Sequence, residues 1–91
     1  MTDVHDIPAR HRFEMLEQGQ TVFADYRRDG RRLIIDHVEA PESLRGTGAA
    51  GRFMEGLVAA ARAEGSTIVP ICSYAAAWLR RHRELAADVV E

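Results

Sequence analysis

The sequence predicts a small α+β domain in which an antiparallel β-meander is followed by a long crossover helix, a parallel strand and a C-terminal helix. Three observations support this order. Apolar and polar residues alternate over much of the first forty positions, which is the period of a strand. From about residue 47 the apolar residues recur every three or four positions, which is the period of a helix. A short β-rich segment and a second segment of helical composition complete the chain.

The first half of the chain divides into three predicted strands. Residues 12–16 alternate and lead into the turn signal EQGQ, and residues 21–26 alternate again. An Asp-Gly pair at 29–30 is a strong hairpin signal, and residues 32–38 form the returning strand. Residues 1–9 are polar and contain a proline, so we expect a flexible tail there.

The second half begins with a helix of about five turns that ends at Gly65. Residues 66–72 do not alternate, which predicts a fully buried strand, and the helix then crosses over between two parallel strands. Residues 74–85 have the composition of a C-terminal helix. The residues of the two helices expected to pack in the core are Ala50, Phe53, Met54, Leu57, Val58, Ala61, Trp78, Leu79 and Leu85.

Composition limits the classes of function. The 91 residues are 46% hydrophobic with a net charge of −2, which fits one domain over residues 1–91. Charges of both signs are interspersed, so we expect no nucleic-acid partner. Nothing resembles a signal peptide or a membrane span, and the single cysteine, Cys72, leaves no intrachain disulfide. We therefore expect a cytoplasmic protein without a membrane partner, and, because the histidines lack metal-ligand spacing, no metal.

The segment LRGTGAAGRFM, between the meander and the long helix, fits two patterns at once. Gly46, Gly48 and Gly51 spell G-x-G-x-x-G, the pattern of a dinucleotide-binding turn. Arg45, Gly48 and Ala50 spell R-x-x-G-x-A, the pyrophosphate loop of acyl-CoA-dependent acetyltransferases. Both patterns place a diphosphate at a helix N-terminus, where free N–H groups and the helix dipole attract anions. The third interpretation is a glycine-rich turn that binds nothing.

The context argues against the dinucleotide interpretation. That turn follows the first strand of a parallel sheet and is followed, about 20 residues later, by an acidic ribose ligand. Here three antiparallel strands are expected first, and no Asp or Glu occurs between Ser66 and Arg83. A kinase-type glycine loop joins two strands, whereas this one opens a helix.

In these features the sequence resembles the GNAT superfamily of N-acetyltransferases, and most closely a minimal, single-domain branch of about this length. The resemblance extends from Phe13 to Leu85 and consists of four blocks in order: HVEAP, RGTGAA, PIC and RHRE. The matching residues are His37, Glu39, Pro41, Arg45, Gly46, Gly48, Ala50, Pro70, Cys72, Arg81, His82 and Glu84. The residues that depart from the pattern are Val38, Ala40, Arg83 and Leu85.

The resemblance implies a GNAT-like fold that binds acetyl-CoA or coenzyme A. In that superfamily the pyrophosphate sits on the loop and helix start, with contacts that here run on to Gly51 and Arg52. The pantetheine arm lies like an added strand along the segment that corresponds to 36–40, where backbone N–H groups polarise the thioester carbonyl. The arginines of the last helix either reach the CoA phosphates or form a solvated face. The residues assigned to cofactor binding are Val38, Arg45, Gly46, Thr47, Gly48, Ala49, Ala50, Gly51 and Arg81.

Three residues are candidates for catalysis. Cys72 is placed to protonate the departing CoA or to accept the acyl group transiently; the alternative is a small buried hydrophobe. Histidine is the commonest general base at neutral pH, which makes His37 a candidate, but its alternation with buried strand residues also fits a role in the sheet. Three roles stay open for Glu39: it acts on the amine through a water, it binds a cationic acceptor, or it is a solvated carboxylate at the strand end. Tyr74 lies near the usual place of a tyrosine acid in this superfamily, although packing is the favoured interpretation.

The leading hypothesis is an enzyme, an acetyl-CoA-dependent N-acetyltransferase that modifies an amine. So short a chain lacks the elements that enclose a small substrate in larger relatives, which favours a protein or peptide acceptor. One alternative is a module that binds CoA or acetyl-CoA with little or no transferase activity. Another is a structural domain whose glycine loop is only a turn.

Overall fold

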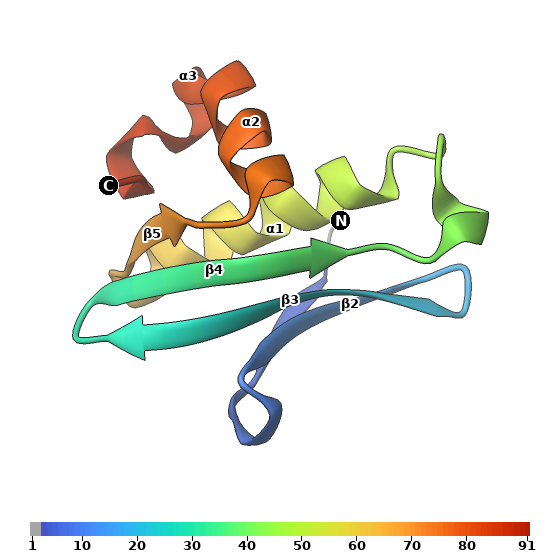
Figure 1. Cartoon of the computed structure of the whole chain (residues 1–91), viewed down its shortest axis with the longest axis horizontal. Helices are drawn as coiled ribbons and strands as arrows, with labels where there is room; N and C mark the ends of the chain where they lie inside the picture. The colour runs from blue at the N-terminus through green and yellow to red at the C-terminus, as the bar shows by residue number, and fades with distance from the viewer. Residues whose placement is uncertain (1–2) are drawn as a thin grey trace.

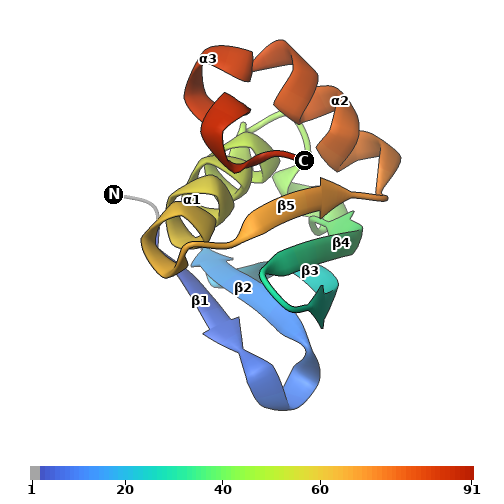
Figure 2. The same ribbon diagram turned by 90° about the vertical axis from the view of Figure 1, so that its left-hand side faces the viewer.

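The computed structural model describes residues 3–91 as one five-stranded sheet with the order β1-β2-β3-β4-β5 and helices on one of its faces (Figures 1 and 2). Short 3-10 helices occupy Pro8–Arg10, Glu42–Leu44 and Ala87–Val89. The strands are β1 Val4–Ile7, β2 Arg12–Glu17, β3 Gln20–Asp29, β4 Arg32–Glu39 and β5 Thr67–Pro70. The α-helices are α1 Ala49–Glu64, α2 Ser73–Arg81 and α3 Arg83–Ala86. The α+β class is therefore confirmed.

The three predicted meander strands are confirmed as β2, β3 and β4, each antiparallel to its neighbour. The hairpins β2–β3 and β3–β4 turn at residues with positive φ. These are Gln18 and Gly19 (φ 52° and 75°) in the first and Gly30 (φ 60°) in the second. The crossover is also confirmed, because β5 returns parallel to β4 after α1.

The expectation of a flexible tail is wrong from Val4 onward; residues 1–2 lie outside the described part of the chain. β1 pairs antiparallel with β2, so the meander has four strands. Asp6 fixes β1 to β3, since it accepts hydrogen bonds from the Tyr26 hydroxyl (2.6 Å) and from Arg28 Nη2 (3.1 Å). Four residues are too few for a strand period to be recognisable in the sequence.

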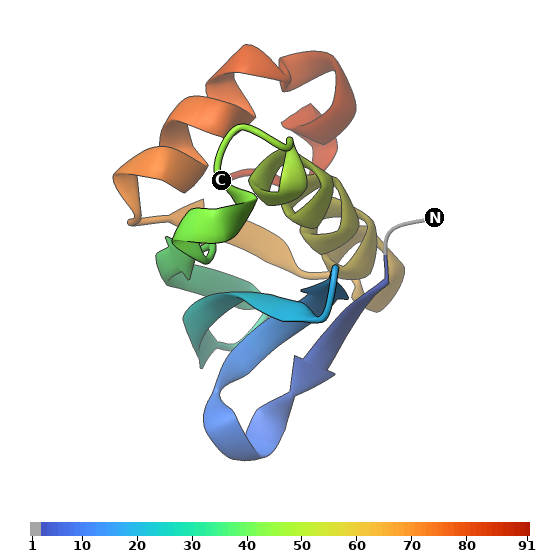
Figure 3. The ribbon, with the colours of Figure 1, turned by 90° about the vertical axis from the view of Figure 1, so that its right-hand side faces the viewer.

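One hydrophobic core lies between the sheet and the helices (Figure 3). Phe13, Val22 and Leu33 contribute from β2, β3 and β4, and the predicted stripe of α1 covers them from Phe53 onward. Ala50, also predicted in the core, is only half-buried, and Ala49 is buried in its place. Side chains that alternate with these core residues point away from the helices, and we call this side the outer face. Its residues on β2 and β3 include Arg12, Glu14, Leu16, Phe23 and Asp25.

Helix α1 ends at Gly65, as predicted. Gly65 adopts φ 77°, and the N–H of Ser66 reaches back to the carbonyl of Ala61 (2.9 Å), which is a glycine C-cap. The strand that follows differs from the prediction of a fully buried one. It lies at the sheet edge, and only Ile68 among its residues is fully buried.

The C-terminal helix is interrupted at His82 and continues as α3. The His82 ring stacks on Trp78 at 3.9 Å, and its Nδ1 bonds the Trp78 carbonyl at 2.8 Å. The side chain thus occupies a backbone acceptor at the helix end. Trp78 and Leu79 are buried as predicted, whereas Leu85 is 46% exposed.

Candidate functional site

The carboxyl half of β4 has one free edge. β5 pairs with β4 only as far as Ile35↔Pro70. The Ile35 carbonyl then accepts the N–H groups of both Ile71 and Cys72, each at 3.0 Å, and the chain turns into α2. Residues 36–39 of β4 continue beyond β5 and, among the described residues, pair only with β3 (Figure 1). Unpaired strand edges offer backbone donors and acceptors to an extended ligand.

A β-bulge lies in β4 at the point where β5 turns away from it. Asp25 and Tyr26 are consecutive, but their partners are His37 and Ile35, so Asp36 is the extra residue on β4. Arg27 holds Asp36 with two hydrogen bonds of 2.7 Å and lowers the pKa of that carboxyl. The bulge reverses the alternation of β4.

This reversal argues against the alternative in which His37 continues the buried face of Leu33 and Ile35. His37 lies on the outer face opposite Asp25, with its ring centroid 6.4 Å from that of Phe23. Glu39, opposite Phe23, lies on the same face, whereas Val38 packs against the core.

His37 and Glu39 form a hydrogen-bonded pair, with 2.9 Å between Nε2 and Oε1. A carboxylate only accepts hydrogen bonds, so Nε2 carries the proton and, in the neutral ring, Nδ1 has the free lone pair. Such a pair suits a general base, because the carboxylate fixes the tautomer and the orientation of the ring. Both side chains are more than half exposed, at 54% and 59%.

The loop before α1 presents a row of free amides. Gly46 and Gly48 adopt φ 81° and 85°, conformations that residues with a side chain rarely adopt. Thr47 Oγ1 accepts the Ala49 N–H at 3.3 Å and supports the turn. Within the described chain, no acceptor occupies the N–H groups of Gly46, Gly48, Ala50 and Gly51. Together with the helix dipole, these amides form a site suited to a phosphate.

Two arginines add positive charge at this loop. The exposed Arg45 has no ion pair within residues 3–91. Arg52 lies against Gly48, because a Cβ on Gly48 would come within 2.9 Å of Arg52 Nη1. Glu17 binds Arg52 through both carboxylate oxygens, and this hydrogen bonding lowers the pKa of Glu17. Sequence reasoning did not find Glu17, which lies 35 positions from Arg52.

A groove of about 540 Å³ joins the free edge to the loop. It brings together five of the predicted site residues and adds Tyr74, for which packing was the favoured interpretation. Cys72 and Arg81, also predicted, are not among its lining residues, and Ala49 is buried in the core. The lining residues are His37, Val38, Glu39, Ala40, Pro41, Glu42, Arg45, Ala50 and Tyr74.

The start of α2 forms the far wall of the groove. Burial raises the pKa of Tyr74, although the nearby charge of Arg81 opposes this change. The phenol therefore keeps its proton at neutral pH and is able to donate it. Cys72 immediately precedes α2 and is half-buried against the core, which fits the packing alternative better than direct contact with a ligand.

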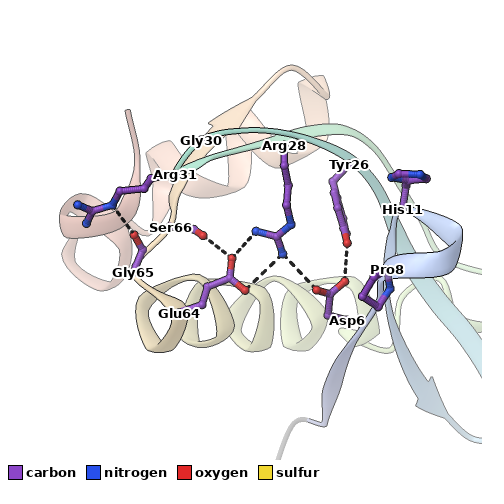
Figure 4. A pocket seen from close by; sticks show the side chains of 10 residues that line it. All are labelled: Asp6, Pro8, His11, Tyr26, Arg28, Gly30, Arg31, Glu64, Gly65 and Ser66. Carbon is purple, nitrogen blue, oxygen red and sulfur yellow. Dashed lines mark hydrogen bonds and ion pairs between the residues drawn. The ribbon is translucent and has the colours of Figure 1, made fainter.

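A larger cavity of about 780 Å³ lies at the other end of α1 (Figure 4). Its central charges satisfy one another. Arg28 donates to Glu64 Oε2 at 2.7 Å and to Asp6 Oδ2 at 3.1 Å, and Ser66 donates to Glu64. The network closes the sheet onto α1, and we assign it a structural role.

Across residues 3–91, no helix is long and apolar enough to cross a bilayer. No group of three or more His, Cys, Asp or Glu side chains is arranged to hold a metal ion in the same part of the chain.

Comparison with known proteins gives a match to a family model and matches to solved structures. The model of the GCN5-related N-acetyl-transferase family matches residues 12–89. The solution NMR structure of a GCN5-like N-acetyltransferase candidate from Staphylococcus aureus superposes with a TM-score of 0.68 at 20% identity, covering 98% of this chain and 87% of that one. This likeness confirms the GNAT-like fold. Curated proteins gave no significant match.

Proposed function

Because the chain belongs to the GCN5-related N-acetyltransferase family, we propose that it transfers an acetyl group from acetyl-CoA to an amine. The observation that carries this proposal is the free edge at residues 36–39, which leads by one groove to the amide-lined loop at 45–51. An extended arm that ends in a diphosphate matches both parts.

The loop would hold the pyrophosphate of CoA. The free amides of Gly46, Gly48, Ala50 and Gly51 supply donors, and Arg45 supplies charge. The pantetheine arm would lie along the edge of β4 and bond its backbone as an added strand does. Each backbone N–H that reaches the thioester oxygen would stabilise the developing negative charge by about 3 kcal/mol. A contact between Arg81 and the CoA phosphates stays a prediction.

The transfer itself needs one base and one acid. The neutral amine nitrogen attacks the thioester carbon, so a C–N bond forms and the C–S bond breaks. His37 Nδ1 would take the proton that the amine loses, with Glu39 stabilising the imidazolium. Tyr74 would give its proton to the thiolate of the departing CoA. Solvent then reprotonates the phenolate and removes the proton from His37.

A second candidate is a module that binds CoA with little transferase activity. The exposure of His37 and Glu39 favours it, because bulk water weakens the electrostatic control of a base. In that case acetyl-CoA binds, but acetyl transfer to any amine does not exceed the uncatalysed rate.

Calorimetry with acetyl-CoA, with NAD as the control, tests which cofactor the protein binds. Binding of acetyl-CoA and not of NAD supports the proposal, whereas binding of NAD alone contradicts it. Gly48→Val should abolish binding, because a β-branched residue at φ 85° distorts the loop. Circular dichroism of this variant checks that it still folds.

Mass spectrometry of amines incubated with acetyl-CoA tests the transfer. His37→Ala should retain CoA binding and lose most of the turnover. Cys72→Ala should also retain binding; a fall in its rate would assign the thiol to the chemistry, and an unchanged rate would assign it to packing. Turnover unaffected by His37→Ala would remove the histidine from the mechanism.

A further inference from the structure

The outer face of the sheet is uncovered beside the groove. The helices lie on the opposite side (Figures 2 and 3), so β2, β3 and β4 expose their outward side chains to solvent. Cross-strand pairs connect this face to the reaction centre, since Phe23 lies opposite Glu39 and Asp25 opposite His37. A molecule bound across these strands would therefore meet the His37–Glu39 pair directly.

The charges on this face are paired until the groove is reached. Arg12 bonds Asp25 at 3.0 Å and Arg27 bonds Asp36 at 2.7 Å. The next carboxylate, that of Glu14, contacts the exposed Arg10 at 3.4 Å.

Two carboxylates at the groove have no arginine partner. Glu39 contacts only His37, and the exposed Glu42 makes no ion pair within residues 3–91. Both line the groove. Arg45, the cation of the same groove that has no ion pair in the described chain, belongs to the loop proposed to bind the diphosphate. Glu39 and Glu42 therefore supply the negative charge that an entering amine meets, which favours a substrate with positive charge next to the reacting group.

Apolar surface accompanies this charge. Leu16 on β2 is 70% exposed, the largest exposure among the large hydrophobic residues of the described chain. Phe23 lies between it and the groove, with the Arg12 guanidinium 3.7 Å from its ring centroid. Leu16 and Glu39 are separated by two strand spacings across the sheet and by two residues along the strands, which corresponds to about 12 Å. Three or four residues of an extended peptide span this distance.

We propose that the acceptor is a basic peptide segment that lies across the outer face, with its lysine at His37–Glu39 and an apolar residue three or four positions away on Leu16. This inference rests on the proposed acetyl transfer and names its substrate class. A second basic residue beside the lysine would approach Glu42.

Capped peptides with one lysine test the proposal. The reference peptide has an arginine beside the lysine and a leucine four positions away; one variant has glutamate for the arginine, and another has serine for the leucine. We expect kcat/KM, measured by mass spectrometry of the products, to be about tenfold lower with glutamate and about fivefold lower with serine. Added salt should reduce the first difference and leave the second.

Protein variants with matched controls test the two contacts. Leu16→Ser should remove the preference for the leucine peptide, whereas Leu85→Ser, at another exposed leucine, should preserve it. Glu42→Lys should lower kcat/KM for the reference peptide, whereas Glu84→Lys, on α3, should not. Calorimetry with CoA confirms that each variant is folded.

The outcomes separate this inference from the proposed function. If acetyl-CoA does not bind, or if no amine is acetylated, the proposed transfer fails and the inference with it. If spermidine or the glutamate peptide is acetylated as efficiently as the reference peptide, the transfer stands and the inference is overturned. Equal effects of Leu16→Ser and Leu85→Ser also overturn it.

Discussion

Gly51 completes the G-x-G-x-x-G pattern, yet its surroundings do not require glycine. A Cβ there would lie 3.5 Å from Trp78 Nε1, an ordinary contact, and its φ is not positive. Gly51→Ala should therefore stabilise the fold by about 0.4–1 kcal/mol, because alanine restricts the unfolded chain and favours the helix. Gly48→Ala should destabilise it by about 1–2 kcal/mol, since φ 85° is a left-handed conformation that costs an L-residue energy.

Thermal unfolding followed by circular dichroism measures both variants against the parent chain. For a domain of this size, 1 kcal/mol corresponds to about 4–8 °C in Tm. We expect Gly51→Ala to raise Tm by a few degrees and Gly48→Ala to lower it by more. A fall in Tm for Gly51→Ala would show that α1 and Trp78 leave no room for a methyl group at position 51, and would refute the reasoning from the 3.5 Å contact.

Three further predictions concern charge and proton transfer. Glu17→Gln should tighten CoA binding about two- to fivefold at low ionic strength, because it removes a carboxylate from Arg52 beside the loop; weaker binding by calorimetry would mean that Glu17 positions the arginine. Hydrogen bonding from Arg28 lowers the pKa of Glu64 from its ordinary 4.5, so this contribution to stability is present above pH 4.5 and is lost as the pH falls through the lowered pKa. The Tm difference between the parent and Arg28→Ala should therefore shrink in acid, and a difference independent of pH would refute the linkage. Tyr74→Phe should lower kcat about 10- to 100-fold while KM for acetyl-CoA changes little; steady-state rates that match those of the parent would exclude the phenol as the acid.

Much of the fold was predictable because its signals are local. The helix period of α1, its glycine C-cap and the turns at Gly19 and Gly30 depend on neighbours in the sequence. β1 was missed because what orders it is distant, namely Asp6 bound by two residues of β3. The break at His82 was missed for a different reason. The sequence there contains no helix-breaking residue, and the stacking of His82 on Trp78 is visible only in the structure.

Part of the candidate site was predictable, because five residues named from the sequence line one groove, although their roles stay predictions. The motif around Arg45 and Gly48 identified the loop before α1, and Gly46 and Gly48 adopt positive φ there. The bulge at Asp36 depends on pairing with β3, so alternation along β4 alone could not show that His37 lies on the outer face. Tyr74 packs against the core, as the favoured interpretation has it, and it also lines the groove, which depends on how β5 turns into α2.

Trp78 is the only tryptophan in the chain, and its position makes it an optical probe of the site. The indole is 4% exposed, lies beside the first turn of α1 and stacks against His82. Its emission should be that of an apolar environment. Because the indole lies beside the turn that follows the loop at 45–51, binding of CoA at that loop should be readable as a change in intrinsic fluorescence, with no label attached to the protein.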